Sequence, residues 1–163
     1  MIAGPLQPAD WQFALVAIPL LLVFWSLVIA IVSLVGGWHN LAKQFRRQET
    51  TFRISTEPIE KFRWASLKMG PVYFPTNYGS CVTVTLSDDG LGLAVMPLIR
   101  PLHPPLLIPW NAIEGCTLGK ELALFDRAKV QLREFANPLR IYGRAGRAVY
   151  RNWLSKDART PRE

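Results

Sequence analysis

The pattern of hydrophobic and charged positions divides the chain into an apolar N-terminal segment and a longer part made of short alternating stretches. No Asp, Glu, Lys or Arg occurs from Trp11 to Ala42, and residues 13–35 are mainly Leu, Val, Ile, Ala and Phe. About 20 such residues in a helix cross the ~30 Å hydrocarbon layer of a bilayer. The pattern therefore predicts a transmembrane helix over 11–38, with Trp11 and Trp38 at its two interfaces.

A cleaved signal peptide is the competing interpretation of this segment. Signal peptides have a basic start and an apolar region of only about 7–15 residues, whereas residues 1–10 contain no Lys or Arg. We therefore expect a retained anchor preceded by a short extracytoplasmic tail over 1–10. Positive charge follows the span at 43–47, and such charge stays on the cytoplasmic side of a membrane. This predicts an outside N-terminus and a cytoplasmic C-terminal part.

Residues 39–58 are expected to form a basic juxtamembrane helix followed by a polar connector. Leu41, Ala42 and Phe45 continue one helical face that starts at Trp38. We expect this helix to run on along the lipid headgroups as an anchor. Specific headgroup recognition would use the same residues, at about 1 kcal/mol per cation near an anionic leaflet, and both interpretations remain open here. The residues expected at the interface are Trp11, Trp38, Lys43, Phe45, Arg46 and Arg47.

Beyond residue 58 the hydrophobic period changes to two, which indicates strands. The clearest signal is a β-hairpin, with alternating stretches at 81–86 and 91–95 joined by a turn that contains Asp88, Asp89 and Gly90. Seven short strands predict a small antiparallel barrel or sandwich. The other five strands are expected at 63–69, 106–108, 113–118, 127–133 and 139–142, with a loop over 70–79, a proline-rich loop before 106 and a turn at Gly119-Lys120.

From Arg144 the pattern becomes helical and amphipathic. Ala145, Ala148 and Val149 lie on an apolar sector, and a basic stripe lies on the other side. We expect the helix to pack on the sheet and to expose the stripe, with 157–163 as a flexible tail. The residues of the candidate partner-docking face are Arg140, Arg144, Arg147 and Arg151.

Composition and charge narrow the possible classes of protein. The chain has 163 residues, 50% of them hydrophobic, and a mean hydropathy of +0.14, which excludes disordered and collagen-like proteins. The net charge of +7 is concentrated at 43–47 and at 140–163, while residues 48–139 are balanced. No nucleic-acid recognition motif accompanies the basic residues, so we expect no nucleic-acid partner.

Few residues could carry chemistry. The only histidines are His39 and His103, and the spacing of Cys81 and Cys116 matches no zinc or redox motif. We therefore expect no enzyme activity, cofactor, metal or small-molecule substrate, with the cysteines as small core residues. A cryptic enzyme centred on His103 is the remaining enzymatic hypothesis.

Several short motifs resemble those of a family of small bacterial single-pass membrane proteins. The resemblance covers residues 37–113, and its most specific part is the block from His103 to Trp110. The order of elements also resembles that of a pleckstrin-homology-like barrel. The resemblance implies a bacterial source and is compatible with the barrel, but it implies no activity. Gly36 and Phe45 depart from the Ser and Tyr expected there. The remaining matching motifs are Gly37-Trp38, Leu41-Ala42, Phe45-Arg46, Asp89-Gly90-Leu91, Met96-Pro97, Arg100 and Ile113.

The sequence thus predicts a single N-terminal transmembrane helix followed by a mainly-β (α+β) cytoplasmic domain over 59–156, a small antiparallel barrel closed by the C-terminal helix. The functional hypothesis is a non-enzymatic binding or scaffolding protein at the bacterial inner membrane. It would be an accessory subunit of a larger complex, with membrane lipids and a membrane protein as partners. The alternative is a module that senses lipid headgroups through its two basic faces. The positions expected to pack against neighbouring membrane helices are Trp25, Ser26, Gly36 and Gly37.

Overall fold

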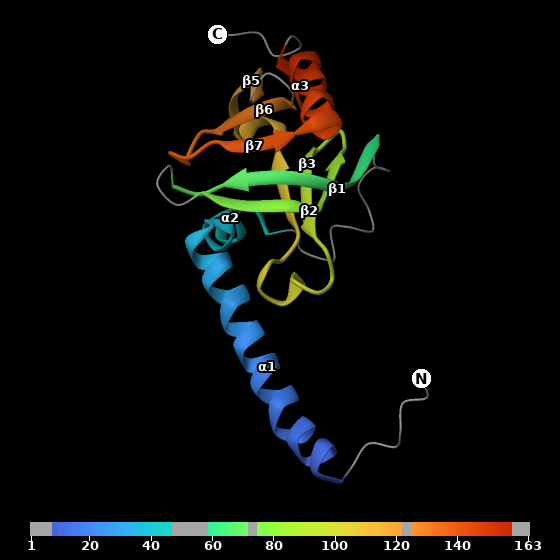
Figure 1. Ribbon diagram of the computed structural model, residues 1–163. Helices are drawn as coiled ribbons and strands as arrows, with labels where there is room; N and C mark the ends of the chain where they lie inside the picture. Colours follow the sequence, from blue (N-terminus) through green and yellow to red (C-terminus); the bar gives the residue numbers. More distant parts are fainter. Residues whose placement is uncertain (1–7, 47–58, 72–74, 122–124, 158–163) are drawn as a thin grey trace, which may run out of the picture.

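The computed structural model describes residues 8–46, 59–71, 75–121 and 125–157. Two helices precede a seven-stranded antiparallel sheet, and a third helix follows it (Figure 1). The elements are α1 (Pro8–Val35), α2 (Trp38–Phe45), β1 (Glu60–Met69), β2 (Thr76–Leu86), β3 (Gly90–Val95), η2 (Arg100–Leu102), β4 (Leu106–Pro109), η3 (Trp110–Ala112), β5 (Ile113–Glu121), β6 (Phe125–Leu132), β7 (Leu139–Tyr142) and α3 (Gly143–Asp157).

The long helix α1 stands apart from the β domain over most of its length (Figure 1). Its stretch Trp11–Val35 is the one helix among the described residues that is long and apolar enough to cross a membrane. Large side chains such as Phe13, Leu21 and Val23 are each exposed by more than half. Such surface would be costly in water, and this agrees with the predicted anchor.

The helix does not run on along the headgroups as expected. The chain turns at Gly37, whose φ of 80° lies in the left-handed region that favours glycine, and α2 starts as a separate helix. The expected apolar face is present, but the β domain covers it. Trp38 is completely buried and Phe45 is only 9% exposed. The prediction that these two rings anchor in the lipid interface is therefore wrong, because both contact the protein core instead.

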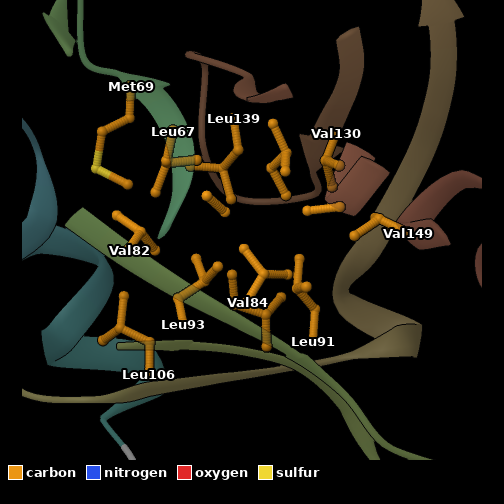
Figure 2. Packing of buried hydrophobic residues seen from close by; sticks show 14 of the residues in the cluster. Leu67, Met69, Val82, Val84, Leu91, Leu93, Leu106, Val130, Leu139 and Val149 are labelled. Carbon is orange, nitrogen blue, oxygen red and sulfur yellow. The ribbon is translucent and has the colours of Figure 1, made fainter. Parts of the chain in front are cut away.

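The sheet is curled into a half-barrel with the order β4-β3-β2-β1-β7-β6-β5, so β4 and β5 are its edges. The long strand β1 lies at its centre and pairs with both β2 and β7. Figure 2 shows the core inside the curl, with α2 (teal) beside Met69, Val82 and Leu106, and with Val149 of α3 at the opposite end. The two short helices α2 and α3 thus cover different ends of one hydrophobic core.

Most predicted strands are confirmed, including the hairpin, in which Val84 pairs with Leu93 and Leu86 with Leu91. Two expected breaks fall inside strands. The β2 strand starts at Thr76, within the expected loop 70–79, because it continues to pair with the end of β1. The expected turn at Gly119-Lys120 lies within β5, where both residues pair with β6.

Parts of the predicted organisation fall outside the described residues. These are most of the tail expected over 1–10, the connector from 47 to 58 together with Arg47, and the end of the tail expected over 157–163.

Replacement of Trp38 by Ala should lower the free energy of unfolding of the β domain by about 3–5 kcal/mol, because it leaves a large cavity in the core. Trp64→Ala is the matched control: this side chain is 67% exposed, so the change should stay below about 0.5 kcal/mol. Urea unfolding of the full chain in a nonionic detergent, followed by near-UV circular dichroism, measures both. Small and equal effects would contradict the core position of Trp38.

Candidate functional site

The C-terminal turns of α1 are fixed to the β domain. Ser33 is 3% exposed, and its Oγ donates a hydrogen bond to the carbonyl of Leu102 at 2.7 Å. A Cβ added to Gly36 would lie 2.9 Å from Oγ1 of Thr76 in β2, so only glycine allows this close approach. The apolar helix α1 therefore meets the β domain through specific packing.

The four positions expected to pack against other membrane helices differ in what they contact. Trp25 is 43% exposed on α1, and the Ser26 hydroxyl donates to the carbonyl of Leu22 within the same helix. Gly36 packs against β2 and Gly37 forms the turn into α2. The glycine pair thus serves contacts within the chain, and the expectation that it packs against a neighbouring helix is corrected.

Trp38, Tyr78 and His103 form a buried cluster where α2, β2 and the proline-rich loop meet. The three rings lie with centroids 5.4–5.5 Å apart, and Nε1 of Trp38 donates to the carbonyl of Pro104 at 3.0 Å. Nδ1 of His103 lies 3.1 Å from the carbonyl of Ile99. A carbonyl only accepts, so Nδ1 carries the proton. Nε2 then accepts from the Tyr78 hydroxyl, also at 3.1 Å.

This network keeps His103 neutral and structural. Burial lowers the pKa of its imidazole, against the opposing effect of the hydrogen bond to Ile99. Burial also raises the pKa of Tyr78 far above its ordinary value, so the phenol remains a donor. His103 is completely buried, and both ring nitrogens are engaged. The arrangement gives His103 no open position from which to act on a substrate.

The two cysteines have different surroundings. Cys116 is 4% exposed, as expected for a core residue, and burial raises the pKa of its thiol to about 11. Cys81 is only half-buried: it packs against the edge of the core and also lines a hollow on the outer sheet face. Among the described residues no group of three or more His, Cys, Asp or Glu is placed to hold a metal ion.

The basic stripe of α3 is exposed at Arg144, Arg147 and Arg151. It is partly neutralised within the chain, since Nε of Arg147 lies 3.3 Å from a carboxylate oxygen of Asp126. Figure 1 shows α3 at the end of the domain away from α1. The stripe therefore lies on the element at the opposite end of the domain from α1.

Arg140 belongs to a different surface. It lies on β7, in register with Lys68 of β1 and Lys129 of β6. The neighbouring positions Leu139 and Ile141 point into the core, so the three cations form a row on the outer face of the sheet. Like charges placed side by side are unfavourable, and a bound anionic group would relieve their repulsion.

An open hollow of about 800 Å³ lies on the outer face of β1–β4. Its floor is made of small side chains, because Thr83 pairs with Ala94 and Thr85 with Gly92. Three cations line it, and none of its lining residues is acidic. Its lining residues include Lys61, Arg63, Trp64, Thr83, Thr85 and Arg100. We call this site the outer hollow.

Trp64 at the outer hollow has a strained backbone. Its φ is 60°, in a region that bulky residues rarely adopt, and it lies in an irregularity of the β1–β2 pairing between Phe62 and Ala65. Strain of about 1–3 kcal/mol of this kind is concentrated at functional sites. The bulge directs a largely exposed indole to the hollow.

Sequence reasoning missed the outer hollow, although one signal pointed to it. The small residues Gly92 and Ala94 occur opposite the threonines of the predicted hairpin, on the face turned away from the core. Arg100 could not be assigned to this site, since it comes from the proline-rich loop.

Comparison of the sequence with models of known protein families and with curated proteins finds no match.

The buried state of His103 predicts a dependence of stability on pH. Because its pKa is lower in the folded chain, the unfolded chain binds the proton more readily, and stability falls as the pH drops below about 6.5. The loss should not exceed about 1.4 kcal/mol per pH unit. Urea unfolding at pH 7.5 and 5.5 measures it. His103→Gln should reduce this slope, whereas the matched control His39→Gln, at an exposed position, should leave it unchanged. Equal slopes in the wild type and both variants would contradict the buried, neutral state of His103.

The left-handed backbone of Trp64 predicts that Gly is the more stable small residue at this position. Trp64→Gly should exceed Trp64→Ala in free energy of unfolding by about 1 kcal/mol, since only Ala retains the steric penalty. Thermal unfolding of both variants in the same detergent tests this. A more stable Ala variant would contradict the positive φ.

Proposed function

We propose that the chain is a non-enzymatic binding or scaffolding protein, an accessory subunit of a larger complex in a bacterial inner membrane. In this proposal α1 is the anchor, its N-terminus lies outside, and the β domain lies in the cytoplasm. The curled antiparallel sheet followed by one helix supports a pleckstrin-homology-like identity of the domain. The motifs at 37–113 support membership of the bacterial family that they resemble.

The outer hollow is the observation that carries the proposal. Three cations and no carboxylates occur among its lining residues, and this favours an acidic partner. The exposed indole of Trp64 supplies an aromatic anchor of the type found at interface hot spots. We infer that the partner presents an acidic cytoplasmic segment with an apolar side chain that fits beside Trp64.

Two further features of the basic surfaces support protein binding over lipid sensing. The stripe on α3 lies at the end of the domain away from α1 (Figure 1), where it would face the cytoplasm. The row formed by Lys68, Lys129 and Arg140 extends the basic character of the outer sheet face. The engaged ring nitrogens of His103 support the non-enzymatic part of the proposal.

A photo-crosslinking residue at Thr83, on the floor of the outer hollow, should capture the same membrane protein repeatedly in native membranes. Lys61→Glu combined with Arg63→Glu should reduce that product at least tenfold, because two attractions become repulsions. Lys120→Glu, at an exposed cation of β5, is the matched control and should leave the product unchanged. Gel analysis of crosslinked membranes measures all three.

Two outcomes would contradict docking at the outer hollow. One is that the chain purifies without any bound protein in a mild detergent at low salt and gives no crosslinked product at Thr83. The other is an equal product from the double variant and from the control. Replacement of residues 15–28 by Leu changes the exposed part of α1 and leaves the contact of Ser33 with the β domain intact. The product should persist if the hollow binds the partner. Its loss would instead assign association to Trp25, Ser26 and the rest of α1.

A further inference from the structure

A second basic site lies where α1 enters the β domain. The apolar stretch Trp11–Val35 has 25 residues, or about 37 Å of helix at 1.5 Å per residue, against a hydrocarbon layer of about 30 Å. Its C-terminal turns therefore reach the headgroup level of a membrane. The bond from Ser33 to the carbonyl of Leu102 holds the loop that contains η2 at this same level. Figure 1 shows that loop (yellow) descending beside the end of α1.

A groove of about 760 Å³ lies between α2 and this loop. Lys43 of α2, Arg46 directly after α2, and Arg100 of η2 line it, and all three are exposed. None of its lining residues is acidic. The backbone of Arg46 also forms a bridge to Leu106 of β4, which fixes the end of α2 beside the edge of the sheet. Two segments more than 50 residues apart thus place three cations around one opening.

We propose that this groove binds the headgroup of an anionic phospholipid from the leaflet around the C-terminal end of α1. The lipid phosphate lies among Lys43, Arg46 and Arg100, where charge-assisted hydrogen bonds are available. Leu98 and Leu102 on the loop are 64% and 44% exposed, and they face the upper acyl chains. Apolar residues beside cations at headgroup depth are typical of surfaces that contact an anionic membrane.

The inference rests on the anchoring part of the proposed function and is independent of the protein partner. Lys61 and Arg63 line only the outer hollow, and Lys43 and Arg46 line only the groove. Variants of the two pairs therefore test the two sites separately. Arg100 is the one cation that lines both sites, so Lys43→Gln is the variant that changes the groove alone.

The test measures lipids that remain bound to the full chain. The protein is placed in nanodiscs that contain equal amounts of phosphatidylglycerol and phosphatidylcholine with the same acyl chains, and native mass spectrometry counts the lipids that it carries on release. The wild-type chain should retain phosphatidylglycerol at least tenfold over phosphatidylcholine. Lys43→Gln and Arg100→Gln should each reduce this preference about fivefold, the factor expected for one cation at an anionic surface.

Lys61→Gln is the matched control, because it removes an exposed cation that does not line the groove, and its lipid preference should equal that of the wild type. If Lys43→Gln does not fold, Arg100→Gln gives the same measurement from the other element. Equal retention of the two lipids by the wild type, or an equal loss in Lys61→Gln, would overturn the proposal. Displacement of the lipid by an equal concentration of glycerol phosphate would also overturn it, since that result assigns the groove to a free phosphate compound.

Discussion

The burial of Trp38 beneath the sheet is the interaction on which the rest of the structure depends. Its ring packs against Tyr78 and His103, and its indole nitrogen binds the carbonyl of Pro104. One side chain thus joins α2, β2 and the proline-rich loop. Because those three elements meet at Trp38, the end of α1 has a defined position relative to the β domain.

This junction gives the protein an orientation as well as an attachment. A membrane helix joined to a domain by an open linker would allow the domain to rotate freely, whereas the contacts of Ser33 and Gly36 hold it against α1. The groove at Arg100 then lies beside the end of α1, and α3 lies at the opposite end of the domain (Figure 1). The basic groove and the basic stripe of α3 thereby lie at opposite ends of the domain.

The β pattern was predictable wherever one face of a strand is buried. The hairpin at 81–95 and the short edge strand around Leu107 follow from alternation and from proline positions. The expected turn at Gly119-Lys120 was wrong, because pairing with β6 carries β5 past a sequence that favours turns locally. For α2 the apolar face was predicted correctly, but the surface against which it packs was not. An amphipathic helix can lie on lipid headgroups or on the edge of a sheet, and its local periodicity is the same in both cases.

The sequence by itself determined the apolar span, the alternating strands, the amphipathic final helix and the location of the excess charge, since each depends on residues within a few positions of one another. Only the tertiary structure decided that Trp38 and Phe45 lie in the core, and that Arg100 joins Lys43 and Arg46 around one groove. The physical reason is that such sites form between segments distant in the chain. Their proximity depends on the register of the whole sheet and on the turn at Gly37, and no local pattern records either.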